Sequence, residues 1–307
     1  MPTEALETLL NRDLSNVAGK DARDINSPLL QELVNYATNV YGRCSNSPII
    51  EENKDAAVLI LYLHITEMVD GVEVLISQSC PTPAIPLIRS AFEAILAIEY
   101  ILEKDIPEKD YVNRSLAWLA AYTHERISSY ERLDPATKKG QEYEKIRAKD
   151  QLSKTLEIFP ALNKHQLEQA RSARATLEQM LAKPQFEQIE TERKNHKGKP
   201  KWYQLFGGPS TLELLARYLN RGAEYEMFYR KWSATTHASD LSRFVERLSQ
   251  ADPTIRVIRD FREIRIISLY AASFILTATH LILRKFHPGE NVDVWYKREI
   301  RTRYLGL

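Results

Sequence analysis

Apolar residues recur along this chain at spacings near 3.6 positions, the period of an α-helix that turns one side toward a core. Breakers such as Pro81-Thr82-Pro83 and His287-Pro288-Gly289 separate the periodic stretches. No two stretches of alternating apolar residues are joined by the turn residues typical of a hairpin. The sequence therefore predicts an all-α fold, with helices over about 3–17, 27–42, 52–79, 84–104, 108–132, 136–150, 163–182, 210–220, 222–238, 240–249, 254–286 and 291–303.

Four of these helices have the composition of a buried core. The helix at 52–79 begins with an almost unbroken apolar run, and the helix at 84–104 carries few charges. Together with the helices at 222–238 and 254–286, they predict a helical bundle with a four-helix core and accessory helices around it.

Composition divides the chain into a core and less apolar parts. We interpret residues 1–50 as N-terminal accessory helices, 51–290 as the helical-bundle core and 291–307 as a C-terminal helix. Within the core, residues 136–200 are rich in Lys, Glu, Gln and Arg, with sparse apolar positions. This composition predicts an exposed helical insertion.

One uncharged run, 266–283, approaches the length that crosses a bilayer. It includes polar residues such as Ser268, Thr277 and His280, which a single membrane helix would expose to lipid. A buried helix of a soluble bundle fits this mixture better, so we expect no membrane contact. With two cysteines and no signal-like N-terminal segment, the sequence favours a cytoplasmic protein.

The net charge of +1 conceals an asymmetry between the two halves of the chain. Residues 1–150 carry 16 Lys and Arg against 24 Asp and Glu, a net charge of −8. Residues 151–307 carry 26 against 17, a net charge of +9. This asymmetry indicates that a polyanion such as RNA would meet the C-terminal half. The alternative is that the two halves pack on each other or on a second subunit.

The sharpest chemical pattern lies in the predicted helix at 222–238. Arg230, Ser233 and His237 stand at positions i, i+3 and i+7, which share one helix face. A guanidinium beside an imidazole suits phosphodiester chemistry, because the cation neutralises phosphoryl oxygens and the imidazole moves a proton near neutral pH. Ser233 can hydrogen-bond either group. The structural alternative is a buried His237 and an Arg230 held in a salt bridge.

A second pair of charged residues, Arg89 and Glu93, stands one turn apart in an otherwise apolar helix. Charges in such a helix are costly unless they are paired, so we expect them to meet each other or a polar group of the 222–238 helix. In the structural interpretation they form an internal ion pair. In the functional interpretation they form the second wall of a site and orient His237.

Two basic stretches are candidates for nucleic-acid binding. The first ends the predicted insertion and contains Arg193, Lys194, Lys197, Lys199 and Lys201. The second is a series of arginines at every third position, beginning with Arg256 and Arg259. The alternatives are a solvated linker for the first and intrahelical ion pairs for the second. No motif for a metal or a cofactor is present, so neither is expected.

Several motifs taken together resemble a bacterial family that is defined only as a domain of unknown function. They are Pro-Leu-Ile-Arg-Ser-Ala-Phe-Glu at 86–93, Trp-Tyr at 202–203, Gly-Gly-Pro-Ser at 207–210, and the series Tyr225, Tyr229, Ser233 and His237. The resemblance covers 55–285. We assign Arg89, Glu93 and Tyr229 as supporting residues of the site around Arg230 and His237.

The spacing of Arg230 and His237, with six residues between them, also resembles the HEPN ribonuclease motif. This resemblance implies a helical bundle that dimerises so that two motifs face each other, and that cuts RNA without a metal ion. Under it, Arg230 binds the scissile phosphate and His237 transfers protons. It also implies a role in phage defence or a toxin–antitoxin system, with an antitoxin or another defence protein as partner.

The leading hypothesis is therefore a homodimeric, metal-independent endoribonuclease whose 222–238 helix lies at or beside the dimer interface. The 2′-hydroxyl of RNA would attack the adjacent phosphate and leave a 2′,3′-cyclic end. The alternative is a non-catalytic helical interaction or regulatory module. In that case Arg230, Ser233 and His237 hold the bundle together or bind a partner.

Overall fold

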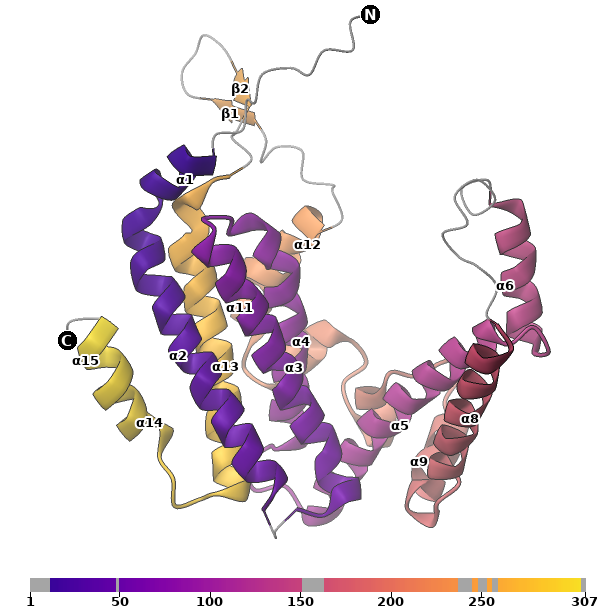
Figure 1. Cartoon of the computed structure of the whole chain (residues 1–307). Coiled ribbons are helices and arrows are strands. Elements are labelled where there is room, and N and C mark those ends of the chain that lie inside the picture. Colours follow the sequence, from indigo (N-terminus) through magenta and orange to yellow (C-terminus); the bar gives the residue numbers. More distant parts are fainter. Residues whose placement is uncertain are drawn as a thin grey trace, which may run out of the picture. The chain divides into compact units, whose positions relative to one another are not determined.

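The computed structural model describes residues 12–47, 50–150, 163–236, 245–247, 253–255 and 259–304. Helices dominate the described residues (Figure 1), which confirms the all-α fold. The chain forms two compact units. Unit 1 combines Met1–Ile106 with Thr211–Leu307, and unit 2 is formed by Pro107–Ser210.

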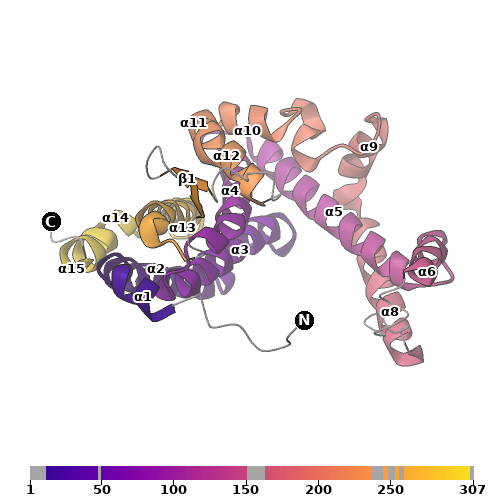
Figure 2. The same ribbon diagram turned by 90° about the horizontal axis from the view of Figure 1, so that it is seen from above.

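Unit 1 is built on four long helices, α2 (Lys20–Ser45), α3 (Glu52–Ser77), α4 (Ile85–Ile101) and α13 (Ile264–Phe286). They lie side by side in both views of the ribbon (Figures 1 and 2), and they bury their facing sides against one another. The predicted four-helix core is therefore present. Its fourth helix is α2, however, and not the helix predicted at 222–238.

The place of α2 follows from a single apolar face. Leu30, Leu33, Ala37 and Val40 recur at helical spacing, and each is at most 2% exposed. The composition of residues 1–50 predicts accessory helices, whereas α2 lies in the core. One apolar stripe is sufficient for a core helix whose other side faces water.

Side-chain hydrogen bonds join the core helices to each other. Ser27 and Gln31 of α2 donate hydrogen bonds of 2.6 and 2.9 Å to the carboxylate of Glu73 on α3. The hydroxyl of Tyr62 on α3 lies 2.9 Å from that of Thr279 on α13. Because an unpaired buried polar group is costly, these bonds favour this particular arrangement of neighbours.

Shorter elements complete unit 1. In chain order they are α1 (Arg12–Ala18), η1 (Thr82–Ala84), α10 (Leu212–Tyr218), α11 (Gly222–Glu224), the π-helix η4 (Tyr225–Arg230), α12 (Lys231–Thr236), η6 (Phe261–Glu263), α14 (Val292–Trp295), the π-helix η7 (Tyr296–Arg301) and α15 (Thr302–Tyr304). The C-terminal helices are attached to α2 through Tyr36, whose ring stacks on that of Trp295 at 3.8 Å. The Tyr36 hydroxyl and the Arg43 guanidinium both hydrogen-bond Glu290.

A cluster of aromatic rings attaches the helical stretch 222–236 to the core. The ring of Phe228, 2% exposed, lies 4.9 Å from that of Phe92 on α4 and 4.4 Å from that of Tyr270 on α13. Trp232 and Phe274 extend the cluster, with rings 5.3 and 5.8 Å from that of Phe228. Tilted and edge contacts of this kind are favourable, and here they set the rotation of the stretch against α4.

Two short strands correct the predicted helices at 240–249 and 254–286. β1 (Val245–Arg247) and β2 (Pro253–Ile255) pair antiparallel, with Val245 opposite Ile255. The β-branched residues favour an extended backbone, and Pro253 cannot donate a helical hydrogen bond. Helix resumes at η6, where the Asp260 carboxylate accepts a hydrogen bond of 2.9 Å from the backbone N–H of Arg262.

The described stretch Phe261–Phe286 is long and apolar enough to cross a membrane. In the structure most of it is α13, and residues such as Ile267, Phe274 and Ile282 are at most 1% exposed. The stretch packs against α2, α3 and α4. Its position in the four-helix core accounts for its apolar composition.

Unit 2 is a separate group of helices around α5. It consists of α5 (Glu108–Leu133), α6 (Lys138–Lys149), α8 (Lys164–Leu181), η2 (Pro184–Phe186), α9 (Glu187–Asn195) and η3 (Trp202–Gly207). The helix α5 packs against α6, α8, α9 and η3. The insertion predicted at 136–200 lies within this unit. The helix α5 precedes the insertion in the chain and packs against its helices.

The carboxylate of Asp134 holds the turn between α5 and α6. It accepts hydrogen bonds of 2.7 and 2.8 Å from the guanidinium of Arg171 on α8, and one of 3.0 Å from the backbone N–H of Ala136. The Arg171 guanidinium outweighs the effect of burial and lowers the pKa of Asp134 to about 2. The charged form of Asp134 is therefore part of the folded state.

We predict that truncating Phe228 destabilises unit 1 strongly, whereas truncating its neighbour does not. Phe228→Ala should cost about 3–5 kcal/mol of unfolding free energy, because it removes a buried ring. Met227→Ala, at a residue that is 72% exposed, should change it by about 0.5 kcal/mol or less. Urea unfolding followed by circular dichroism measures both values. Similar values for the two variants would contradict the packing of Phe228.

We predict that Asp134 makes the protein less stable in acid. Folding lowers its pKa from 3.8 to about 2, so its stabilisation is complete above pH 3.8 and is lost as the pH falls through about 2. Asp134→Asn should be less stable than wild type near neutral pH, and the difference should shrink in this window. Thermal unfolding of both proteins across the window tests this. A difference that does not vary with pH would argue against it.

Candidate active site and a basic aromatic pocket

The helix that carries the predicted catalytic residues contains a π turn. In η4 (Tyr225–Arg230) the backbone hydrogen bonds span one residue more than in an α-helix. The ring of Tyr225 stacks on that of Tyr229 at 5.1 Å and lies 5.6 Å from the Arg230 guanidinium. Single π turns occur frequently at functional sites.

What we call the motif cluster consists of two groups of contacts that share helix α4: Arg89 and Glu93 of α4 with Tyr229 of η4, and His64 of α3 with Ser90 of α4. The Arg89 guanidinium lies over the Tyr229 ring, 4.4 Å from its centroid. The Tyr229 hydroxyl donates a hydrogen bond of 2.5 Å to the Glu93 carboxylate. His64 Nε2 lies 2.8 Å from Ser90 Oγ. All five belong to unit 1.

The cluster contains a cation with unused hydrogen-bonding capacity. The Nε–H of Arg89 is buried and has no acceptor among the described residues. Burial raises the pKa of Tyr229, and its hydrogen bond to Glu93 raises it further, which outweighs the opposing effect of Arg89. Tyr229 is therefore a neutral hydrogen-bond donor near pH 7. An anion with oxygen acceptors is the group that such donors bind.

The sequence left two partners open for Arg89 and Glu93, each other or a polar group of the 222–238 helix. The structure brings both of them to Tyr229 of that helix. The cluster also includes His64 and Ser90, which the sequence analysis did not select. A histidine within an apolar stretch was the only available signal for His64, because the sequence does not show which face of α3 meets α4.

Of the three predicted catalytic residues, the structure describes Arg230 and Ser233. The Arg230 guanidinium pairs with Glu213 at 2.6 Å and with Glu226 at 2.9 Å, and its side chain is 55% exposed. Ser233 is half-buried on α12. His237 lies outside the described residues. The salt bridge expected for Arg230 in the structural alternative is therefore present.

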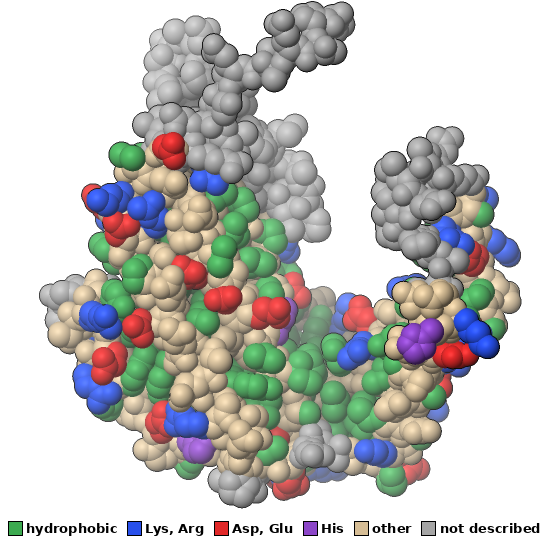
Figure 3. Space-filling view, in the orientation of Figure 1, with side chains coloured by type: hydrophobic (Ala, Val, Ile, Leu, Met, Phe, Trp, Pro, Cys, Tyr) green, Lys and Arg blue, Asp and Glu red, His purple; other side chains and the backbone are tan. Residues whose placement is uncertain are grey.

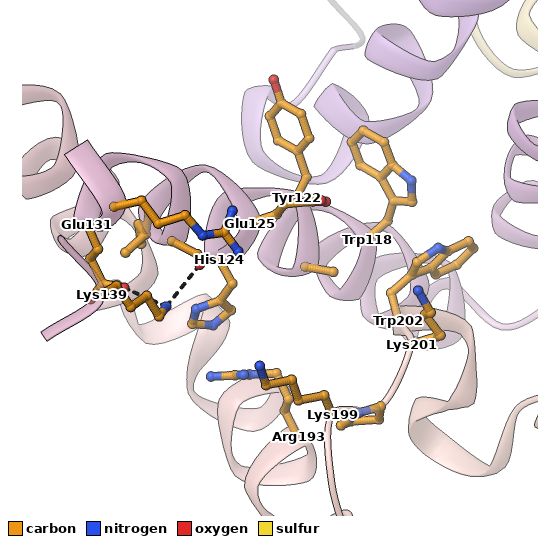
Figure 4. A pocket seen from close by; sticks show the side chains of 15 residues that line it. Trp118, Tyr122, His124, Glu125, Glu131, Lys139, Arg193, Lys199, Lys201 and Trp202 are labelled. Atoms are coloured by element: carbon orange, nitrogen blue, oxygen red, sulfur yellow. Dashed lines mark hydrogen bonds and ion pairs between the residues drawn. The ribbon is translucent and has the colours of Figure 1, made fainter. Parts of the chain in front are cut away.

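Unit 2 contains a pocket of about 720 Å³ with aromatic and basic walls (Figure 4). Trp118 and Tyr122 come from α5, Trp202 from η3, and Arg193, Lys199 and Lys201 from the basic segment that the sequence analysis selected. The rings of Trp118 and Tyr122 are nearly parallel, with centroids 5.5 Å apart. Arg193 stands in the last turn of α9, so this basic segment begins as helix.

A histidine and a carboxylate support the pocket. His124 Nε2 lies 2.7 Å from Glu190, which also accepts a hydrogen bond of 3.0 Å from Arg193. Burial alone would raise the pKa of Glu190, but the hydrogen bonds from His124 and Arg193 lower it overall. The Nε–H of Arg193 is buried without an acceptor among the described residues.

The other predicted basic residues that the structure describes are not among those that line the pocket. Lys194 and Lys197 are exposed, and Arg259 donates a hydrogen bond of 2.9 Å to the carbonyl oxygen of Gln78. Arg256 lies outside the described residues. Because helix begins only at η6, Arg259 does not belong to a helical stripe of arginines, and that prediction is wrong there. Figure 3 likewise shows both charges interspersed on the visible face of unit 1.

The fold and these two sites define the class: a helical-bundle protein with a polar cluster on its core helices and a basic aromatic pocket in a second helical unit. The chain belongs to the family of unknown function DUF5677, whose profile matches residues 55–252. The matched region includes every residue of the motif cluster and all those named for the pocket. The expectation of a family of unknown function is thereby confirmed. Neither curated proteins nor solved structures gave a match.

We predict that Tyr229 links α4 to the π turn through two separable interactions. Tyr229→Phe keeps the ring under Arg89 and should cost about 1 kcal/mol, the value of one hydrogen bond. Tyr229→Leu should cost more, and a double-mutant cycle with Arg89→Met should give a coupling of about 0.5–1 kcal/mol. Urea unfolding of the four proteins measures the cycle. A coupling near zero would exclude the cation–π contact.

Proposed function

We propose that this protein is a metal-independent endoribonuclease of the HEPN-like type. The observation that carries the proposal is the motif cluster, in which the guanidinium of Arg89 keeps a buried donor without an acceptor among the described residues. The Tyr229 hydroxyl lies beside it and bonds the Glu93 carboxylate, and His64 and Ser90 form a second pair between α3 and α4. Imidazole, hydroxyl and carboxylate groups are those that acid–base cleavage of a phosphodiester uses.

In the proposed reaction the 2′-oxygen of a ribose attacks the adjacent phosphorus. A histidine, which we assign to His237 on the Arg-x6-His spacing, takes the proton of the 2′-hydroxyl. The bond between phosphorus and the 5′-oxygen breaks, and that oxygen receives a proton from a second acid. The products are a 2′,3′-cyclic phosphate and a 5′-hydroxyl. Guanidinium groups neutralise the charge that develops on the phosphoryl oxygens.

Arg230 is proposed to bind the scissile phosphate by exchanging its partners. Its ion pairs with Glu213 and Glu226 are solvent-exposed, and such pairs contribute only about 0–1 kcal/mol each. A phosphate offers the same guanidinium two charged acceptors in a bidentate geometry. Ser233, one turn further along the helix, can hydrogen-bond the phosphate or the histidine.

We propose that the protein is a homodimer in which the 222–238 helices of the two subunits face a shared cleft. The second subunit then supplies the second acid–base group. A two-fold interface repeats each contact, so it brings two copies of Arg230 and His237 together. The proposal includes a cytoplasmic role in phage defence or a toxin–antitoxin system, with an antitoxin or defence protein as partner.

The alternative function is a non-catalytic interaction or regulatory module. It is favoured by the ion pairs of Arg230, which already occupy its guanidinium. It is also consistent with the contact of Tyr229 with α4, which stabilises the bundle without any ligand.

We predict that the purified protein cleaves labelled single-stranded RNA in the presence of EDTA and leaves 2′,3′-cyclic ends. His237→Ala should reduce the rate by about 10²–10⁴-fold, the usual effect of removing a general acid or base. Arg89→Met should also reduce it. Gel analysis of the products, with circular dichroism of each variant, measures cleavage and folding separately.

His165→Ala is the matched control, because His165 is an exposed histidine of α8. It should cleave at the wild-type rate. Folded wild-type protein that leaves RNA intact, or a folded His237→Ala variant that cleaves like wild type, would refute the proposed mechanism. Either result would leave the alternative function, a non-catalytic interaction or regulatory module.

A further inference from the structure

The walls of the unit 2 pocket combine flat aromatic surface with positive charge. Trp118 and Trp202 lie at the same end of the pocket (Figure 4). The Trp118 ring also stacks on that of Tyr122, with centroids 5.5 Å apart. Indole and phenol faces are the platforms on which unpaired nucleobases stack in sequence-tolerant binding. The aromatic residues alone would also suit other flat apolar groups.

The charges of the pocket narrow the class of ligand. Five Lys and Arg side chains line it against two carboxylates, Glu125 and Glu131. One of those carboxylates is paired with Lys139 at 2.6 Å. Lys199 and Lys201 form no ion pair with any described residue. Arg193 pairs with Glu190 at 3.0 Å but keeps its buried Nε–H without an acceptor among the described residues. Unpaired cations beside aromatic rings suit a ligand with phosphates next to a base.

The shape of the site favours a single strand over a duplex. A base reaches a concave pocket only when it is unpaired and unstacked from its neighbours. A volume of about 720 Å³ is that of a pocket for a discrete group, whereas a duplex would be recognised on a flatter or more extended surface.

From these observations we infer that the unit 2 pocket binds an unpaired nucleotide of a single-stranded RNA. The base stacks against Trp118 and Trp202, and Arg193, Lys199 and Lys201 hold the phosphates on either side of it. This site is distinct from the motif cluster, and binding there does not require cleavage. The choice of RNA as the strand rests on the proposed function.

Binding of a fluorescein-labelled RNA of about 12 nucleotides, a length within the range of single-strand sites, tests the inference by anisotropy. All proteins carry His237→Ala and the buffer contains EDTA, so that cleavage does not interfere. Trp118→Ala and Trp202→Ala should each weaken binding by about ten- to a hundredfold, the value of one stacking platform. Trp118→Phe and Trp202→Phe, which keep a ring and the fold, should lose less.

Trp295→Phe is the matched control, because Trp295 stacks on Tyr36 in unit 1. It should bind RNA like the parent. Tryptophan emission provides a second readout: RNA should quench the fluorescence of the parent and of Trp295→Phe, but much less that of the Trp118→Phe, Trp202→Phe double variant. Lys199→Gln should also reduce the slope of log affinity against log salt by about 0.7, the value of one single-strand phosphate.

Three outcomes would overturn the inference: no binding by the parent protein, equal binding by the parent and the folded alanine variants, or tighter binding of a duplex of the same sequence. Tighter binding of a single-stranded DNA would refute RNA as the ligand. Because binding is measured without cleavage, a protein that binds through the pocket but never cleaves would refute the proposed function alone.

Discussion

The burial of the Phe228 ring is the contact on which the arrangement of unit 1 around the motif cluster depends. Phe228 lies among the rings of Phe92, Tyr270 and Phe274, which belong to two core helices. Its neighbour Tyr229 is thereby directed at Arg89 and Glu93 on α4. If Phe228 were displaced, the hydrogen bond and the cation–π contact of Tyr229 would lose their geometry together, because both are carried by the same turn.

Glu73 and Tyr62 in the core have hydrogen-bond partners, whereas the motif cluster and the unit 2 pocket each contain an arginine with an unsatisfied donor. Inside the core, Glu73 and Tyr62 each have hydrogen-bond partners on neighbouring helices, as buried polar groups usually do. In the motif cluster and in the unit 2 pocket, one guanidinium Nε–H is left without an acceptor among the described residues. Unsatisfied buried polar groups are costly for stability. They also occur elsewhere in the described structure, for example at Ser268 Oγ on α13, but at these two sites the unsatisfied donor belongs to an arginine.

The sequence predicted the helices well where composition and periodicity agree. The helix expected at 108–132 is observed as Glu108–Leu133, and the one expected at 163–182 as Lys164–Leu181. Features that depend on partners distant along the chain could not be predicted from the sequence. Nothing in residues 20–45 shows that their single apolar stripe meets α3 and α13, and nothing in residue order shows that His64 meets Ser90.

The candidate site was predictable to a similar degree. Arg89, Glu93 and Tyr229 were selected from their types and spacing, and they do come together. The basic segment at 193–201 was selected by charge, but its role as a pocket wall required Trp118 and Tyr122 of α5, which only the fold brings beside it. The short strands were missed because helical periodicity extends by chance into β-branched residues near Pro253.

The π turn at Tyr225–Arg230 has a consequence for how this chain tolerates changes in length. A π turn holds one residue more than an α-helical turn, and each residue of an α-helix advances the direction of its side chains by about 100°. Deleting one residue from the π turn would convert it to an α-helical turn and leave Ser233 and the residues after it on their present face. The π turn is therefore the place in this helix that can lose a residue without a change of phase, whereas a deletion in a regular helical turn rotates everything after it by about 100°.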